Sequence, residues 1–226
     1  MKLVMSGLEH AVEVESGCIS TLQVENEALF ARIVRSIASL QGREAIEPFT
    51  IWENGAEIKP QSALLFVSDL LHLPWDDRAL MGEVLKRIER EFLEDEDLRR
   101  AVESMDSSIA AKLLDLGFGM NSDYRFGLEW DFKRYLKFRG FGADPLADES
   151  LLDNVLNFLS LALDAGCEKI ITFVNLKTFL TKNEVETLSE NVFYLKANVL
   201  LLENKRDEMV YDNERKLTVD LDFFES

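Results

Sequence analysis

The spacing of apolar positions changes along the chain, and each change predicts a different kind of element. Near the N-terminus, residues 11–14 and 19–24 alternate apolar with polar side chains, which predicts half-buried strands. Residues 27–40 then carry apolar side chains at helical spacing, and Asn26 before them is a suitable N-cap. The N-terminal part of the chain is therefore predicted to be mixed α and β.

The middle of the chain is dominated by helical periodicity. After a hairpin predicted at Asn54-Gly55, residues 61–139 contain few glycines and carry an apolar stripe that repeats at helical spacing. The segment 140–150, GFGADPLADES, combines two glycines, a proline and several acids. Such a composition breaks regular structure and predicts a linker.

The clearest pattern is a buried strand, a capped helix and a second buried strand. IITFV, residues 170–174, is apolar without alternation, as in a strand covered on both faces. Thr181 and Glu184 form a capping box ahead of a helix predicted over 182–194. ANVLLLE follows as the second strand, so the three elements predict a parallel βαβ unit. The tail LTVDLDFF alternates and predicts a more exposed strand at the edge of the sheet.

Strand patterns concentrate at the two ends of the chain, whereas helical patterns fill its middle. We therefore predict the α/β fold class, with a head domain built from residues 1–59 and 151–226 around a parallel sheet. A mainly helical leg domain, residues 60–150, is inserted between these parts.

Composition and charge limit the possible functions. The chain has 226 residues, 47% of them hydrophobic, and a formal net charge of −17. No apolar run approaches the ~18–20 residues that span a bilayer, the N-terminus lacks a secretory pattern, and Cys18 and Cys167 are expected to be free thiols. These observations predict a cytoplasmic protein without a membrane partner. The negative charge disfavours nucleic acid unless the cations gather on one surface.

The loop after the first buried strand occupies the place where many nucleotide enzymes hold phosphate. Lys177-Thr178 matches the last two letters of a phosphate-binding loop, but no glycine precedes it, and Leu176, Phe179 and Leu180 are bulky. Asn175 and Thr181 are better explained as residues that satisfy backbone groups. Because zinc and nucleophile-elbow motifs are also absent from the sequence, we predict that the protein is not an enzyme. An ATPase-like protein with a degenerate nucleotide site is an alternative.

One window interleaves cations with aromatic residues. The sequence RFGLEWDFKRYLKFRG supplies five candidate DNA-binding residues, which are Arg125, Lys133, Arg134, Lys137 and Arg139. Cations can contact phosphates and rings can stack on bases. The alternative is an amphipathic helix that places its aromatics in a core and its cations in water.

Two acids in the same window are candidate metal ligands. Glu129 and Asp131 lie two residues apart and could share a hard cation such as Ca²⁺, which prefers oxygen ligands. A solvated pair of acids is the alternative.

The order of these features resembles one family, the small subtype II-A CRISPR-associated protein that accompanies spacer acquisition. The resemblance covers nearly the whole chain, and residues 169–203 are its most specific part. It rests on the segments LEHAVEVESGCISTLQVENEALFARIVRSI, IKPQSALLFVSDLL, LEWD, KIITFVNLKTFLTKNEVETL and ANVLLLE, and on the D-x-D-F-F tail.

The resemblance implies a nucleotide-hydrolase-like head without nucleotide motifs and an inserted helical leg. It further implies a homotetrameric ring whose basic channel encloses double-stranded DNA at free ends without reading sequence. Calcium stabilises such rings, and the CRISPR integrase complex and the effector nuclease are the implied partners. No catalytic activity is attributed to the family. A protein-interaction scaffold that never touches DNA is a further alternative.

Individual residues carry the resemblance unevenly. Glu129 and Asp131 match the acidic L-E-x-D element near which the family holds calcium, and Lys137 matches a lysine that the family keeps ahead of a glycine, here Gly140. The preceding stretch, DLGFGMNSDYRFG, is less acidic than is usual in the family, which leaves the calcium expectation open. The cations of FKRYLKFR are correspondingly dense.

Overall fold

The structure divides the chain into two compact units. The computed structural model describes every residue except 123 and 125–129. The head comprises residues 1–75 and 144–226, and the leg comprises residues 76–143; the sequence predicts these boundaries at 60 and 150. The predicted α/β class, with a parallel sheet and a helical region, is confirmed.

A five-stranded parallel sheet forms the centre of the head. Its strand order is β6 (Leu64–Phe66), β7 (Ile170–Val174), β8 (Asn198–Glu203), β3 (Cys18–Val24) and β9 (Glu214–Val219). β7 and β8 are neighbours joined through α7 (Lys182–Leu195), which confirms the predicted βαβ unit. β9 lies at the edge, as its alternating pattern predicts, although the strand ends at Val219 and the tail turns back.

The sheet corrects two sequence predictions. β3 was expected to be half-buried, yet it has neighbours on both sides and every residue after Cys18 is buried. Its polar side chains are tolerated because they are hydrogen-bonded: Ser20 Oγ donates to Glu13 O at 2.6 Å, and Gln23 accepts from Thr218 Oγ1 at 3.0 Å. β6 lies in the stretch predicted to be mainly helical. The sequence does not predict this strand because three residues are too few to show a period of two.

A smaller antiparallel sheet lies beside the first. Its order is β2 (Val12–Glu13), β1 (Lys2–Met5), β4 (Phe49–Glu53) and β5 (Ala56–Ile58). The predicted hairpin joins β4 and β5, and its turn residues Asn54 and Gly55 both have positive φ, 51° and 80°. A type I′ turn requires positive φ at both positions, which explains the Asn-Gly pair.

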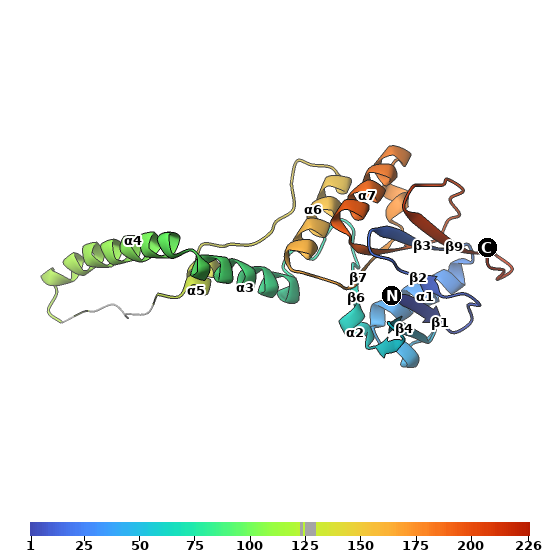
Figure 1. Cartoon of the computed structure of the whole chain (residues 1–226), viewed down its shortest axis with the longest axis horizontal. Coiled ribbons are helices and arrows are strands. Elements are labelled where there is room, and N and C mark those ends of the chain that lie inside the picture. Colours follow the sequence, from blue (N-terminus) through green and yellow to red (C-terminus); the bar gives the residue numbers. More distant parts are fainter. Residues whose placement is uncertain (123, 125–129) are drawn as a thin grey trace. The chain divides into compact units, whose positions relative to one another are not determined.

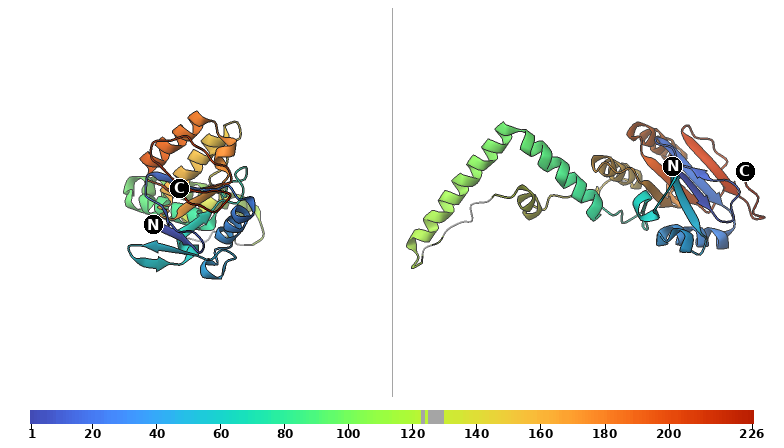
Figure 2. Two further views of the ribbon diagram at one scale, coloured as in Figure 1. Left: turned by 90° about the vertical axis from the view of Figure 1, so that its right-hand side faces the viewer. Right: turned by 60° about the horizontal axis from the view of Figure 1, so that its bottom comes forward.

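Helices cover both faces of the five-stranded sheet (Figures 1 and 2). α6 (Leu151–Asp164) and α7 lie on one face, while α1 (Glu27–Ser39), α2 (Pro60–Ala63) and the smaller sheet lie on the other. A continuous apolar core joins α1 and the smaller sheet to the inner strands; its members include Leu3, Leu22, Ile33, Phe49 and Leu200. A short helical turn, η1 (Gly42–Glu44), completes this side.

The leg is helical. α3 (Arg78–Glu94) has Asp77 as its N-cap. Asp95 is both the C-cap of α3 and the N-cap of α4 (Glu96–Asp115). η2 (Leu116–Gly119) and α5 (Phe132–Phe138) complete the described part of the leg. The predicted stripe of α3 packs inward at Leu80, Val84 and Phe92. In the part of the chain that the structure describes, no helix is both long and apolar enough to cross a membrane.

The capping box of α7 yields a stability prediction. Thr181 Oγ1 accepts from Glu184 N, while Glu184 Oε2 accepts from Thr181 N at 2.7 Å. Thr181→Ala should lower the free energy of unfolding by about 1 kcal/mol, because it leaves a helix-end amide without its partner. Urea denaturation followed by circular dichroism measures this loss.

Thr187→Ala is the matched control, since Thr187 is exposed on the same helix and lies away from its N-terminus. If both variants lose the same free energy of unfolding, the capping hydrogen bond contributes no stability beyond that of a threonine on the helix surface.

Candidate functional site

The described part of the basic and aromatic window, residues 130–140, contains α5. Asp131 is the N-cap of α5, and its Oδ1 accepts from Arg134 N at 2.9 Å. The ring of Phe132 stacks on Phe92 of α3, with centroids 4.3 Å apart, and Trp130 lies 5.5 Å from the same ring. The aromatic residues at the start of α5 therefore fix this short helix against α3.

The four described cations of the window differ in their surroundings. Lys133 Nζ lies 2.6 Å from Glu89 Oε2, and Arg134 Nε lies 3.3 Å from Asp131 Oδ2. Lys137 and Arg139 are exposed, and neither makes an ion pair with another described residue. The last two cations are therefore the ones most available to an external anion.

Arg125 and Glu129 fall outside the described residues. The amphipathic alternative accounts for Trp130 and Phe132, which pack on α3. It does not account for Phe138, whose side chain is 85% exposed at the end of the same helix.

Asp131 is the described member of the predicted calcium pair, and both of its carboxylate oxygens have partners within the chain. Oδ1 caps α5, and Oδ2 pairs with the guanidinium of Arg134. Among the described residues, no group of three or more acidic, histidine or cysteine side chains is placed to hold a metal. The described residues therefore offer no calcium site by themselves.

A second polar site lies at the carboxyl end of the parallel sheet, where open α/β sheets commonly bind ligands. The loop after β7 forms the helical turn η3 (Leu176–Phe179), and Asn175 before it has a left-handed conformation with φ of 53°. Asn175 Oδ1 accepts from Asn204 N at 3.0 Å, and Thr181 caps α7. The prediction that Asn175 and Thr181 satisfy backbone groups is confirmed.

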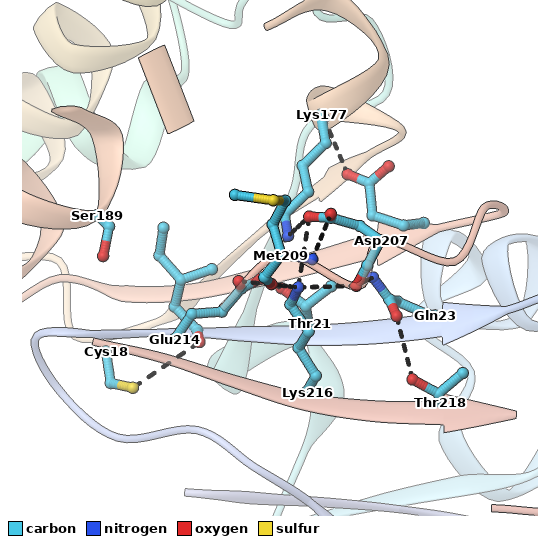
Figure 3. A network of polar contacts seen from close by, with 12 residues as sticks. Cys18, Thr21, Gln23, Lys177, Ser189, Asp207, Met209, Glu214, Lys216 and Thr218 are labelled. Carbon is cyan, nitrogen blue, oxygen red and sulfur yellow. Dashed lines mark hydrogen bonds and ion pairs between the residues drawn. The ribbon is translucent and has the colours of Figure 1, made fainter. Parts of the chain in front are cut away.

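Lys177 occupies the position of a phosphate-binding lysine, but its charge is already neutralised (Figure 3). Its Nζ lies 2.6 Å from Glu214 Oε1 and 3.0 Å from Asp207 Oδ2, and its side chain is 9% exposed. The ammonium also lies 4.9 Å from the ring centroid of Tyr211. Burial alone would lower the pKa of Lys177, but hydrogen bonds and attraction to Glu214 and Asp207 raise it overall.

A second lysine and a third carboxylate complete this group. Lys216 Nζ donates to Asp207 O at 2.9 Å and also to Met209 O, which holds the segment between β8 and β9 on the sheet. Glu203, at the end of β8, is 3% exposed, and its Oε1 accepts from Lys177 N at 3.0 Å. We call these residues the head cluster; its members are Lys177, Glu203, Asp207, Glu214 and Lys216.

The head cluster is close to electrically balanced when Glu203 carries a proton. Burial, aided by repulsion from Glu214 and Asp207, raises the pKa of Glu203 to about 7, against the opposing hydrogen bond and charge of Lys177. Two lysines then face two charged carboxylates. The backbone amide of Lys177, which could have met a phosphate, donates instead to the carboxyl group of Glu203. This arrangement stabilises the edge of the sheet rather than presenting donors to a ligand.

Sequence reasoning missed most of the head cluster. Lys177 was recognised, but its partners come from β8, β9 and the segment between them, and long-range pairing is invisible in a single sequence. The one available signal is Glu203, a charged residue that ends the apolar run LLLE at the carboxyl end of a buried strand.

Glu203 gives the free energy of unfolding a specific pH dependence. Its pKa is raised from the usual 4.5 to about 7 in the folded chain, so between these values the folded state binds more proton than the unfolded state. The stability contributed by the protonated group is complete below the unfolded pKa and is lost as the pH rises through the folded pKa. Glu203→Gln keeps an acceptor without a charge, so it should be more stable than the wild type at pH 8, by about 1–3 kcal/mol, and similar at pH 5.

Urea denaturation of both proteins at the two pH values tests this, with Glu190→Gln as the control on the exposed face of α7. A difference between wild type and Glu203→Gln that does not change with pH would contradict a titrating carboxyl at this site.

Two comparisons with known proteins place the chain in a family. The family model described as CRISPR-associated protein (Cas_Csn2) matches residues 44–223, a range that includes α5 and the loop after β7. A curated relative from Enterococcus faecalis, "CRISPR-associated protein Csn2", is 22% identical over 227 residues, and the alignment covers 99% of this chain and 97% of the relative. The resemblance inferred from the sequence is confirmed, and the chain belongs to the Csn2 family of CRISPR-associated proteins.

Proposed function

We propose that this protein is a non-catalytic, sequence-independent binder of double-stranded DNA ends, acting in CRISPR spacer acquisition. Membership of the Csn2 family implies a role in CRISPR adaptation. In the proposal, four copies form a ring, and a basic channel through the ring encloses the DNA. The CRISPR integrase complex and the effector nuclease are the proposed partners, and the cytoplasm is the proposed location.

The observation that carries the proposal is the pair of free cations at the end of α5. Lys137 and Arg139 are exposed and form no ion pair within the described part of the chain. Binding without sequence preference depends on contacts between cations and phosphates, and each contact gains free energy by releasing counterions. Cations already paired with Glu89 or Asp131 would have to give up those partners first.

The net charge of −17 is compatible with DNA binding if cations from several copies face one channel. Contacts that are weak in one copy then act together, because binding by the first copy raises the effective concentration of the others. An acidic exterior would repel nucleic acid from the outside of the ring. The charge distribution, rather than the sum, determines where DNA can bind.

The non-catalytic part of the proposal rests on the head cluster. Lys177 is paired with Glu214 and Asp207, and its backbone amide is bonded to Glu203. A nucleotide phosphate at this edge would have to displace carboxylates that already hold these donors. We therefore favour DNA binding over the ATPase-like alternative.

A ring predicts a preference for free ends. A linear duplex should bind, whereas the same sequence closed into a covalent circle should not, because a closed assembly admits DNA only at an end. Gel-shift titrations at low salt measure this difference. The titrations are run both with calcium and with EDTA. This comparison tests the proposed calcium site near Glu129 and Asp131, which the described residues do not form by themselves.

Equal binding of the circle would indicate an open surface instead of a ring. Absence of binding to either form would favour the protein-interaction scaffold.

The free cations predict a specific loss of affinity. Replacing Lys137 and Arg139 by glutamate should weaken binding of the linear duplex by about tenfold or more and reduce the steepness of its salt dependence, because phosphate contacts are lost. Fluorescence anisotropy over a series of salt concentrations measures both quantities.

The matched control replaces Lys205 and Arg206, which are exposed in the head, by glutamate and changes the net charge equally. If both double variants lose the same affinity, overall charge rather than the end of α5 determines binding, and the site assignment fails.

A further inference from the structure

Phe138 is placed unusually for a large apolar side chain. It is 85% exposed, although phenylalanine is among the residues most often buried. Phe132, on the same helix, packs on Phe92, and 3.6 residues per turn set Phe138 about 120° away from it. Phe138 therefore belongs to the outward face of α5, and the packing of the leg does not explain it.

Phe138 is surrounded by cations and by two further exposed aromatic residues, Tyr135 and Phe141. Arg134 precedes it by one turn and has a side chain that is 88% exposed. Lys137 and Arg139 flank it in sequence and have no ion-pair partner among the described residues. The net charge of the protein is −17, so a cluster of cations around the phenyl group of Phe138 is a local exception. Such a surface is complementary to an anionic partner that also carries flat aromatic groups.

We propose that Phe138 stacks on an unpaired base at the end of the DNA, while Lys137 and Arg139 contact the phosphates beside that base. Inside a duplex both faces of each base are covered by neighbouring bases, and the last pair of a blunt end exposes its outer face alone. An unpaired base in a single-stranded overhang can turn a face toward a side chain that lies beside the DNA. Stacking tolerates any sequence because every base has such a face. The inference rests on the proposed function and deepens it, because it predicts which kind of DNA end is preferred.

A contact with a second copy of this chain is the competing explanation for an exposed phenylalanine. An apolar contact between proteins would place other apolar side chains around the ring, because charged residues are depleted at the centre of such contacts. Phe138 is instead accompanied by three cations, Arg134, Lys137 and Arg139, beside the two exposed aromatic residues Tyr135 and Phe141. Charge complementarity therefore favours nucleic acid.

The test compares three linear duplexes of one length by fluorescence anisotropy. One has blunt ends, one has an overhang of thymines, and one has an overhang of the same length that lacks bases but keeps its phosphates. The wild type should bind the thymine overhang about fivefold or more tightly than the abasic overhang, since stacking adds to the phosphate contacts. Phe138→Ala and Phe138→Leu should lose this difference, and Phe138→Tyr should keep it.

Phe179→Ala, which removes a ring that is 56% exposed in the head, is the matched control and should behave as the wild type. If the wild type binds no DNA, the proposed function fails. If it binds both overhangs equally, or if Phe138→Ala keeps the preference, the stacking inference alone is overturned. Light scattering measures the oligomeric state of Phe138→Ala. If this variant loses the wild-type oligomer but keeps the overhang preference, the phenyl group of Phe138 serves a contact between copies.

Discussion

The ion pairs of Lys177 with Glu214 and Asp207 hold three segments of the head together. They connect the turn after β7 to the first residue of β9 and to the segment between β8 and β9, both of which come later in the sequence. Lys177 alone could not balance the nearby carboxylates of Glu214 and Asp207. A buried charge without a partner would lower the free energy of unfolding by several kcal/mol. The second lysine, Lys216, and the protonated form of Glu203 bring the group close to neutrality. These contacts add to the pairing with β3 that holds the edge strand β9.

This constraint separates two properties that are often confused in α/β proteins. A parallel sheet with a turn and a capped helix at its carboxyl edge has the geometry of a nucleotide site. Such a sheet can bind a nucleotide only if the hydrogen-bond donors at that edge are free to contact phosphate. Here the backbone amide and the ammonium of Lys177 both face carboxyl groups of the same chain. The fold is retained while the donors are used internally, and the candidate binding surface lies on α5 in the other unit.

The elements that could be predicted from the sequence are those with strong local determinants. The capping box at Thr181, the Asn-Gly turn and the apolar run of β7 each fix their structure within a few residues. β3 is more buried than its alternating pattern predicts, because distant partners satisfy its polar residues, as Thr218 does for Gln23. The candidate site shows the same limit. The density of cations around α5 was visible in the sequence, but the pairing of Lys133 with Glu89, on another helix, was not.

The closed head cluster has a consequence for how such a protein is regulated. A motor protein changes shape because a nucleotide enters an edge of its sheet and later leaves it. In this head, Lys177 and Lys216 hold the segment after β8 through contacts within the chain itself. If the protein binds no nucleotide, as we propose, the conformation of the head does not depend on the energy charge of the cell. In the proposed assembly, release of bound DNA would then depend on salt, on competing partners or on spontaneous opening of the assembly, and not on nucleotide hydrolysis.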